Sequence, residues 1–311
     1  MDDAADILGT SDIGTNTKQI LEFYAKPGPM TLLNKQHGHT VKNLPNDIGM
    51  LVEIVQGLVI HQFAAKPFYG VDVSIERINK ESHIRKSADL LDAIHAISIA
   101  PLSEKRAPAD RLVGVCHHFA KLLLTMLRAK GIPARMRYGF GDYFNPNFYE
   151  DHSLVEYWNR GKRCWTLVDP QFDGIWQQRL HIKHNIFDVS RDRFLTAGSA
   201  WIKCRDGELN AAAFGIFNMR GWWFVAGNLI KDIAALNKME MLQWDGWTGM
   251  PRPNNAMKDK KRLAFFDELA ELTRDPDASF RKIRKLYQDK SKKVYVPERV
   301  FNAIRRHLER I

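Results

Sequence analysis

The sequence is poor in cysteine and lacks long apolar runs. It holds three cysteines, Cys116, Cys164 and Cys204, too few for a disulfide framework in a chain of 311 residues. No apolar run reaches the roughly 18 residues of a membrane-spanning helix. The acidic start, Met1-Asp2-Asp3, lacks the basic-then-apolar order of a signal peptide. We therefore expect a cytoplasmic protein with no membrane partner.

The composition is that of an ordinary globular protein, because 45% of the residues are apolar and 26% are charged. The formal net charge of +10 is uneven: residues 258–311 carry 16 Lys or Arg against 9 Asp or Glu. A basic surface attracts anionic partners. The simplest interpretation is a solvated basic helical tail over residues 256–311, open to an acidic partner. Because the tail has no recognised nucleic-acid motif, we do not expect nucleic acid as its main partner.

Apolar spacing and turn residues predict the order of the elements. Residues up to about 40 show weak periodicity and are predicted to be loosely structured. Helices are predicted from about 47, 87–98, 116–130 and 227–241, with strands over 134–140, 152–158 and 163–169. Residues 141–151 are predicted to form a loop, and residues 159–162 a turn. Beyond Lys258, prolines 276 and 297 separate three short helical patterns.

Cys116 stands where the predicted long helix begins. A cysteine nucleophile needs a lowered pKa, a nearby base and a group that orients the base. The positive end of the helix dipole favours a thiolate at this position. Cys116 shares an apolar stripe with Leu123 and Leu127, which predicts that it faces the core. His117 aligns with a polar stripe and is predicted to be solvated.

The predicted hairpin supplies a base and an orienter. With a turn centred on Arg160-Gly161, His152 lies directly across from Asp169. Directly opposed residues place their Cβ atoms about 4.5–5.5 Å apart, so Asp169 would fix the tautomer of the His152 imidazole. Glu156 shares the face of His152, and either a supporting role in the site or an exposed strand carboxylate fits that position. Asp151 points to the opposite face and is a poor orienter.

A metal site fits this pattern badly. His117 and His118 are adjacent on a helix, so their side chains point about 100° apart and do not easily share one ion. Zinc sites also favour spaced ligand pairs. Cys164 alternates away from Asp169 and is interpreted as structural. We therefore expect neither a metal nor another cofactor.

The residues that carry this constellation resemble the transglutaminase-like superfamily. The cysteine helix is similar over Gly114-Val115-Cys116, Leu122-Leu123-Leu124 and residues 127–135, and the later strands are similar at His152, Glu156 and Trp165–Pro170. The sequence departs from that pattern at Leu154, where an aromatic residue is usual. Residues 192–201 and 227–232 further resemble a poorly characterised bacterial branch of the superfamily.

This resemblance implies an α+β fold with a papain-like core, in which the cysteine helix packs on an antiparallel sheet. Together with the residue pattern, it predicts thiol-dependent acyl transfer by Cys116, His152 and Asp169 on a peptide, protein or small amide or ester. We expect a helical part of the core over 1–110, the catalytic core over 111–175, an aromatic-rich part over 176–255 and the tail over 256–311. The alternative is a catalytically silent interaction module that docks through the basic tail.

Overall fold

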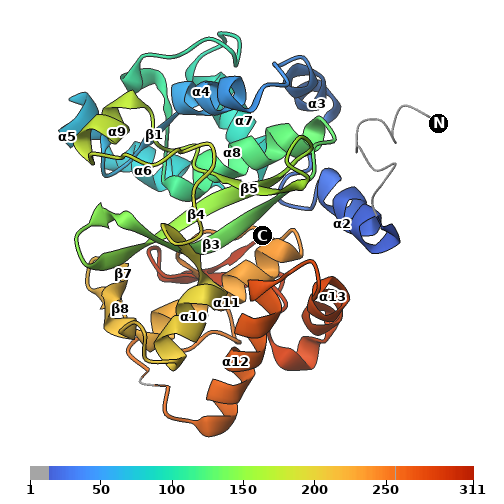
Figure 1. Ribbon diagram of the computed structural model, residues 1–311. Helices are drawn as coiled ribbons and strands as arrows, with labels where there is room; N and C mark the ends of the chain where they lie inside the picture. The colour runs from blue at the N-terminus through green and yellow to red at the C-terminus, as the bar shows by residue number, and fades with distance from the viewer. Residues whose placement is uncertain (1–13, 256) are drawn as a thin grey trace. The chain divides into compact units, whose positions relative to one another are not determined.

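A computed structural model describes residues 14–255 and 257–311 of the chain (Figure 1). The α-helices are α2 (Thr15–Ala25), α3 (Lys35–Lys42), α4 (Ile48–Leu58), α5 (Ala65–Tyr69), α6 (Ile75–Glu81), α7 (Ser87–Ile97), α8 (Cys116–Ala129), α9 (Gly174–Arg179), α10 (Ala197–Arg205), α11 (Trp222–Leu236), α12 (Lys260–Arg274) and α13 (Phe280–Gln288). The strands are β1 (Val59–His61), β2 (Leu112–Gly114), β3 (Ala134–Asn145), β4 (Phe148–Asn159), β5 (Cys164–Val168), β6 (Phe194–Thr196), β7 (Phe214–Ile216), β8 (Met219–Arg220), β9 (Asp245–Gly246), β10 (Arg299–Asn302) and β11 (His307–Arg310).

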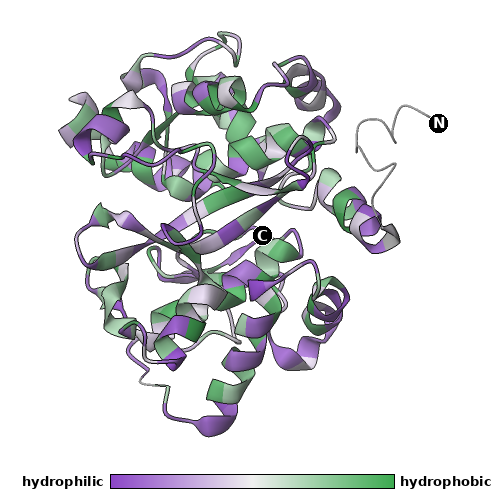
Figure 2. Cartoon of the chain, viewed as in Figure 1, coloured by the Kyte–Doolittle hydropathy of each residue, from purple (hydrophilic) through white to green (hydrophobic). Residues whose placement is uncertain are grey.

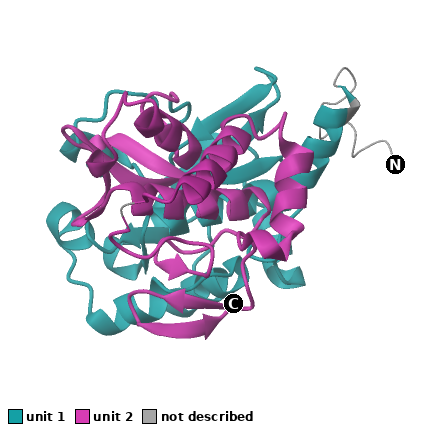
Figure 3. Ribbon diagram, turned by 90° about the horizontal axis from the view of Figure 1, so that it is seen from below, with its two compact units in different colours: residues 1–136, 154–189 teal, residues 137–153, 190–311 magenta. Residues whose placement is uncertain are grey.

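The chain divides into two compact units (Figure 3). Unit 1 holds the described residues up to Met136 together with Leu154–Val189, and unit 2 holds Arg137–Ser153 and Ser190–Ile311. The divisions fall inside β3 and β4, so each of these strands contributes residues to both units. The fold is α+β, as the sequence predicts.

Unit 1 is built around the apolar helix α8, much of which is coloured hydrophobic in Figure 2. Ahead of this helix, β1 and β2 pair in parallel, with His61 opposite Gly114. β5 pairs antiparallel with the second half of β4. Every residue of α8 from Cys116 to Arg128 is buried, so this helix forms the centre of the unit's core.

Local signals explain where the predicted helices begin and end. The Asp47 side chain accepts a hydrogen bond from the Met50 backbone N–H at 2.9 Å and caps the start of α4. α8 stops before Gly131, which takes a left-handed φ of 73°, and Pro133 follows. The predicted helices over 87–98 and 116–130 are confirmed as α7 and α8.

Unit 2 combines the tip of the β3–β4 hairpin with the C-terminal helices. In this unit β3 pairs antiparallel with β6, and β4 pairs in parallel with β7, which turns back into β8. A further sheet has the order β11-β10-β9. The sheet pairings of the protein are therefore mixed rather than purely antiparallel.

Three predictions about secondary structure are wrong. Residues 14–42 are not loosely structured, because α2 and α3 form there and bury Ile20, Leu21 and Val41. Residues 141–151 are not a loop: β3 continues to Asn145 and β4 starts at Phe148, with the turn between them. The helical pattern predicted after Pro297 is instead a β-hairpin, since β10 and β11 pair antiparallel.

Among the described residues, no helix combines the length and the apolar character that crossing a membrane requires. The longest helices in the described part of the chain, α11 and α12, have 15 residues each, whereas a membrane crossing takes about 20.

Candidate functional site

A capping interaction fixes the start of the helix that carries Cys116. Val115 is the N-cap of α8, and its backbone N–H donates to Nδ1 of His118 at 3.1 Å. Burial, with the nearby Lys121 charge, lowers the pKa of His118 to about 3. The imidazole is therefore neutral over the physiological range, and its Nδ1 remains an acceptor. This cap places Cys116 at the first position of the helix.

Gly114 is required for this cap because the helix start leaves no room for a side chain. A Cβ at Gly114 would lie 2.8 Å from both Cβ and Cγ of His118. Real Cβ atoms essentially never approach so closely, so a larger residue would displace the imidazole. The sequence signal for this arrangement is the Gly-Val-Cys segment followed by a histidine three residues after Val115.

A buried carboxylate anchors the strand that leads to Cys116. Oε2 of Glu81 accepts from the Val113 N–H at 2.6 Å, and its Oε1 accepts from Nε of Arg77 at 2.7 Å. The same guanidinium donates to the Arg111 carbonyl at 2.7 Å. Glu81 is buried, and its charge is balanced by Arg77. Nothing in the sequence pattern predicted this anchor, because the partners are 32 residues apart.

The polar stripe of α8 is buried, so the prediction that His117 is solvated is wrong. His117 is 0% exposed, and Lys121 is equally buried. The stripe packs against other parts of unit 1: Lys121 Nζ donates to the Arg85 carbonyl at 3.1 Å, and Thr125 bonds to Ser87 at 2.7 Å. Helical periodicity distinguishes two faces of a helix, but it does not reveal that both faces are covered.

His152 lies in an aromatic setting within unit 2. Its side chain is buried, with the ring of Phe144 at 5.0 Å, that of Tyr143 at 6.1 Å and that of Phe194 at 6.4 Å between centroids. These contacts surround the imidazole with edge-on rings. Leu154 leaves the usual aromatic position unfilled, and these three residues from β3 and β6 provide aromatic surface around His152 instead.

Asp151, next to His152, is a buried acid on the β4 strand. Burial raises its pKa to about 7, partly opposed by the charges of Lys231 and His152 and by a hydrogen bond with Asn228. Glu150 on the same strand adds to the rise. Burial likewise lowers the pKa of Lys231. This group on β4 and α11 therefore carries less charge at neutral pH than its sequence suggests.

Asp169 follows the end of β5 in unit 1. It is fully buried, its N–H donates to the Ile186 carbonyl at 2.8 Å, and its Oδ1 accepts from the Gln171 N–H at 3.1 Å. The hydrogen bond from the Gln171 N–H to the carboxylate thus closes a local turn directly after β5 and holds Asp169 in place.

The predicted hairpin register is wrong by two residues. The ladder pairs Val155 with Val168 and Asn159 with Cys164, because the connection has four residues, 160–163, and ends with Arg163 at a left-handed φ of 52°. The cross-strand argument that placed His152 directly opposite Asp169 therefore fails. A shift of two residues leaves each side chain on its predicted face of the strand.

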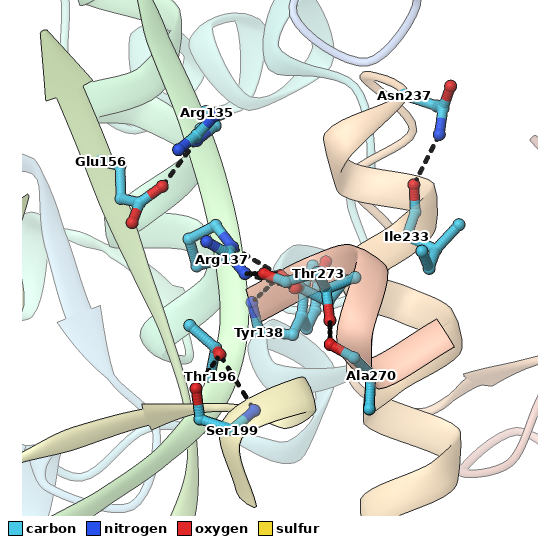
Figure 4. Close-up of polar contacts among 11 residues, drawn as sticks. Arg135, Arg137, Tyr138, Glu156, Thr196, Ser199, Ile233, Asn237, Ala270 and Thr273 are labelled. Carbon is cyan, nitrogen blue, oxygen red and sulfur yellow. Dashed lines mark hydrogen bonds and ion pairs between the residues drawn. The ribbon is translucent and has the colours of Figure 1, made fainter. Parts of the chain in front are cut away.

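Glu156 is not an exposed strand carboxylate. It is 0% exposed and pairs with Arg135, whose Nε lies 2.6 Å from its Oε2 (Figure 4). The guanidinium also stacks over Trp165 at 4.1 Å and Tyr24 at 5.3 Å from the ring centroids. This cluster ties β3, β4, β5 and α2 together inside unit 1. Cys164, at the start of β5, is exposed.

A second buried ion pair organises unit 2, and Figure 4 labels its arginine, Arg137, together with Thr273. Arg137 on β3 bonds Asp232 on α11 through Nε at 3.0 Å and Nη2 at 2.8 Å, and both side chains are at most 1% exposed. The same Nη2 donates to the Thr273 carbonyl on α12 at 3.0 Å. Gly198 leaves no room for a side chain against this helix, since a Cβ there would lie 2.2 Å from Oγ1 of Thr273. Arg137 thus holds α11 and α12 on β3, and Gly198 lets α10 pack closely against α12.

The three predicted catalytic residues belong to different units. Cys116 and Asp169 lie in unit 1 and His152 in unit 2, and all three side chains are buried. Their mutual geometry stays a prediction. Among the described residues, no group of three or more His, Cys, Asp or Glu side chains is arranged to hold a metal ion.

Comparison with known proteins identifies the central segment. Residues 88–170, which include all three predicted catalytic positions, match the model of the transglutaminase-like superfamily. This segment is therefore similar to transglutaminase-like domains. The chain is also 35% identical over 71 residues to a protein-glutamine gamma-glutamyltransferase of Pseudomonas aeruginosa, a match that covers 20% of this chain and 10% of the relative. The chain thus spans about a tenth of the length of that curated relative.

A solved structure, that of a candidate cysteine protease from Cytophaga hutchinsonii, also matches. It is 19% identical, with 58% of this chain and 50% of the other covered, at a TM-score of 0.21. That score supports no conclusion about the fold or the activity of this chain.

Proposed function

We propose that the protein is a cysteine-dependent acyltransferase or hydrolase. The observation that carries the proposal is the position of Cys116 at the first residue of α8, inside the segment that matches the transglutaminase-like superfamily. The helix start stabilises negative charge on sulfur. The neutral His118, two residues further on, is occupied as the acceptor of the cap, and we assign the role of base to His152.

In this mechanism Cys116 gives its proton to His152, and its Sγ attacks the carbonyl carbon of an amide or ester. The carbon–oxygen π electrons move to the oxygen and return as the leaving group departs with the proton from His152. The product is a thioester on Cys116, and a second acceptor then attacks it. Water as the acceptor gives hydrolysis, and an amine gives transfer. Asp169 orients the imidazole and stabilises its charged form.

Peptides and proteins are the proposed natural acyl donors, because the curated relative is named for acting on protein glutamine. A small activated ester is the simplest probe, since its good leaving group lets the thioester accumulate. The experiment is mass spectrometry of the intact protein after mixing with such an ester. We expect one added acyl group on the wild type and on Cys164→Ala, and none on Cys116→Ala. Acylation of Cys116→Ala to the same extent as the wild type would contradict the proposal.

A second candidate function is docking of an acidic partner on the basic tail. Six cations, Arg281, Lys282, Lys285, Lys290, Lys292 and Lys293, are exposed, and none of them has an ion pair with a described residue. Ile283, Leu286 and Tyr287 of the same segment are buried, so deleting the tail would remove part of the core. The appropriate test replaces Lys282 and Lys285 with Glu and measures binding to an acidic peptide against salt concentration. Unchanged binding would exclude this surface.

A further inference from the structure

Gln62 lies beside the start of the catalytic helix, although it is 54 residues away in the sequence. It follows β1, and its N–H donates to the Gly114 carbonyl at 2.8 Å, which extends the parallel pairing of His61 with Gly114. Neighbouring strands lie about 4.8 Å apart, and Cys116 comes two residues after Gly114. The backbone of Gln62 is therefore held next to the segment from which Cys116 projects.

The side-chain amide of Gln62 is not fixed by the protein. The residue is partly buried, and its Oε1 is buried without a hydrogen-bond partner among the described residues. An unpaired buried polar atom costs about 1–3 kcal/mol, so such a group calls for an explanation, and a catalytic role is one of them. Rotation about the last side-chain bond exchanges the amide oxygen and the NH2 group, so the same place can present a donor.

Two other polar side chains around this helix start are bound to the backbone of the segment that leads to Cys116. His118 accepts the Val115 N–H, and Glu81 accepts the Val113 N–H. Glu81 can only accept, and the His118 ring interacts with the backbone at Val115 and Ile84. Gln62 combines a donor group with no side-chain hydrogen bond that would hold it away from a substrate.

We propose that the NH2 group of Gln62 donates a hydrogen bond to the carbonyl oxygen of the acyl group that Cys116 attacks. This inference rests on the proposed function and supplies an oxyanion donor beside the backbone N–H groups of the first turn of α8. When the bond from Sγ to carbon forms, the electron pair of the carbonyl moves to the oxygen, and Gln62 stabilises that charge without transferring a proton. The leaving group takes its proton from His152.

The test compares Gln62→Met, which keeps a similar volume but has no donor, with the wild type. Hydrolysis of an activated ester is measured together with alkylation of Cys116 by iodoacetamide across pH. We expect kcat to fall by about 10²–10³-fold, the loss typical for one oxyanion donor, with little change in KM. The alkylation rate and its pH profile should be unchanged, because alkylation forms no oxyanion. Gln288→Ala, at an exposed position, is the control and should match the wild type.

The outcomes separate this inference from the function on which it rests. An ester kcat of Gln62→Met within about threefold of the wild type, with a reactive Cys116, would overturn the role of Gln62 alone. Equal losses of ester turnover and alkylation would assign Gln62 a structural role and also overturn it. A wild-type Cys116 that neither alkylates rapidly nor turns over ester would overturn the proposed function and this inference together. If Gln62→Met does not fold, Gln62→Ala gives the same readouts.

Discussion

His118 accepts a hydrogen bond from the backbone N–H of Val115 at 3.1 Å, and this bond sets the residue at which α8 begins. Its pKa of about 3 keeps the imidazole uncharged, so the cap persists across the physiological pH range. His118, two residues after Cys116 in the sequence, thus serves the helix start. The chemistry proposed for Cys116 depends on this start, because the helix dipole acts within the first turn.

Gly114→Ala should destabilise the protein and slow the reaction of Cys116. The added methyl group would lie 2.8 Å from the His118 ring and Cβ, and overpacking of this kind costs about 1–3 kcal/mol. Chemical denaturation and the rate of Cys116 alkylation test the two effects. Gly38→Ala is the matched control, since a Cβ at Gly38 meets nothing within 4 Å. That helical site should gain about 0.4–1 kcal/mol, and equal effects at both sites would contradict the account.

Glu156→Ala should cost about 3–5 kcal/mol of unfolding free energy, because it removes one partner of a buried ion pair. The matched control is Glu208→Ala, which breaks the exposed pair with Lys203 at 2.5 Å and should cost at most about 1 kcal/mol. Denaturant titration measures both. If the two variants lose similar stability, the Arg135–Glu156 pair does not hold β3 to β4 as described.

Asp232→Ala should loosen unit 2 more than unit 1. The carboxylate accepts from Arg137 at 2.8 Å and from the Tyr138 N–H at 2.9 Å, and the loss of a buried charge partner costs about 3–5 kcal/mol. Hydrogen exchange should show faster exchange in α11 and α12 than in α8. Uniform acceleration in both units would mean that the pair stabilises the whole chain rather than its own unit.

Asp151→Asn should remove a pH dependence of stability. The folded-state pKa of about 7 lies above the ordinary value of 3.8, so the folded protein binds more protons than the unfolded chain between these values. This acid therefore makes stability fall as pH rises from about 4 to 7, by at most about 4 kcal/mol. The difference in unfolding free energy between Asp151→Asn and the wild type should grow in favour of the variant over that range. A constant difference would show that Asp151 ionises normally.

The sequence predicts the helices and strands well, but it predicts poorly which other segments pack on them. α4, α7 and α8 follow from apolar spacing, the Asp47 cap and Gly131, all of which act within a few residues. The burial of His117 and the pairing of Glu156 with Arg135 depend on segments that pack on these elements from elsewhere in the chain. Periodicity within one element carries no information about such neighbours.

In the candidate site, too, local features could be predicted from the sequence and contacts between distant segments could not. Cys116 is predicted from its place at a helix start, and it lies inside the segment that matches the transglutaminase-like superfamily. The His152–Asp169 register failed because a single left-handed residue, Arg163, set the loop length, and turn type is not determined by strand pattern. Glu81 and Gln62 were missed because their partners, Val113 and Gly114, are distant in the sequence.

The most direct test of the central claim is the alkylation rate of Cys116 against pH. Cys164→Ser is the suitable background because the Cys164 thiol is exposed, while burial raises the pKa of Cys204 to about 12 and keeps that thiol slow. We predict a fast reaction that titrates well below the ordinary thiol value of about 8.5, disappears with Cys116→Ala and changes its pH profile with His152→Ala. A Cys116 that titrates at or above about 8.5 and is indifferent to His152→Ala would contradict the account.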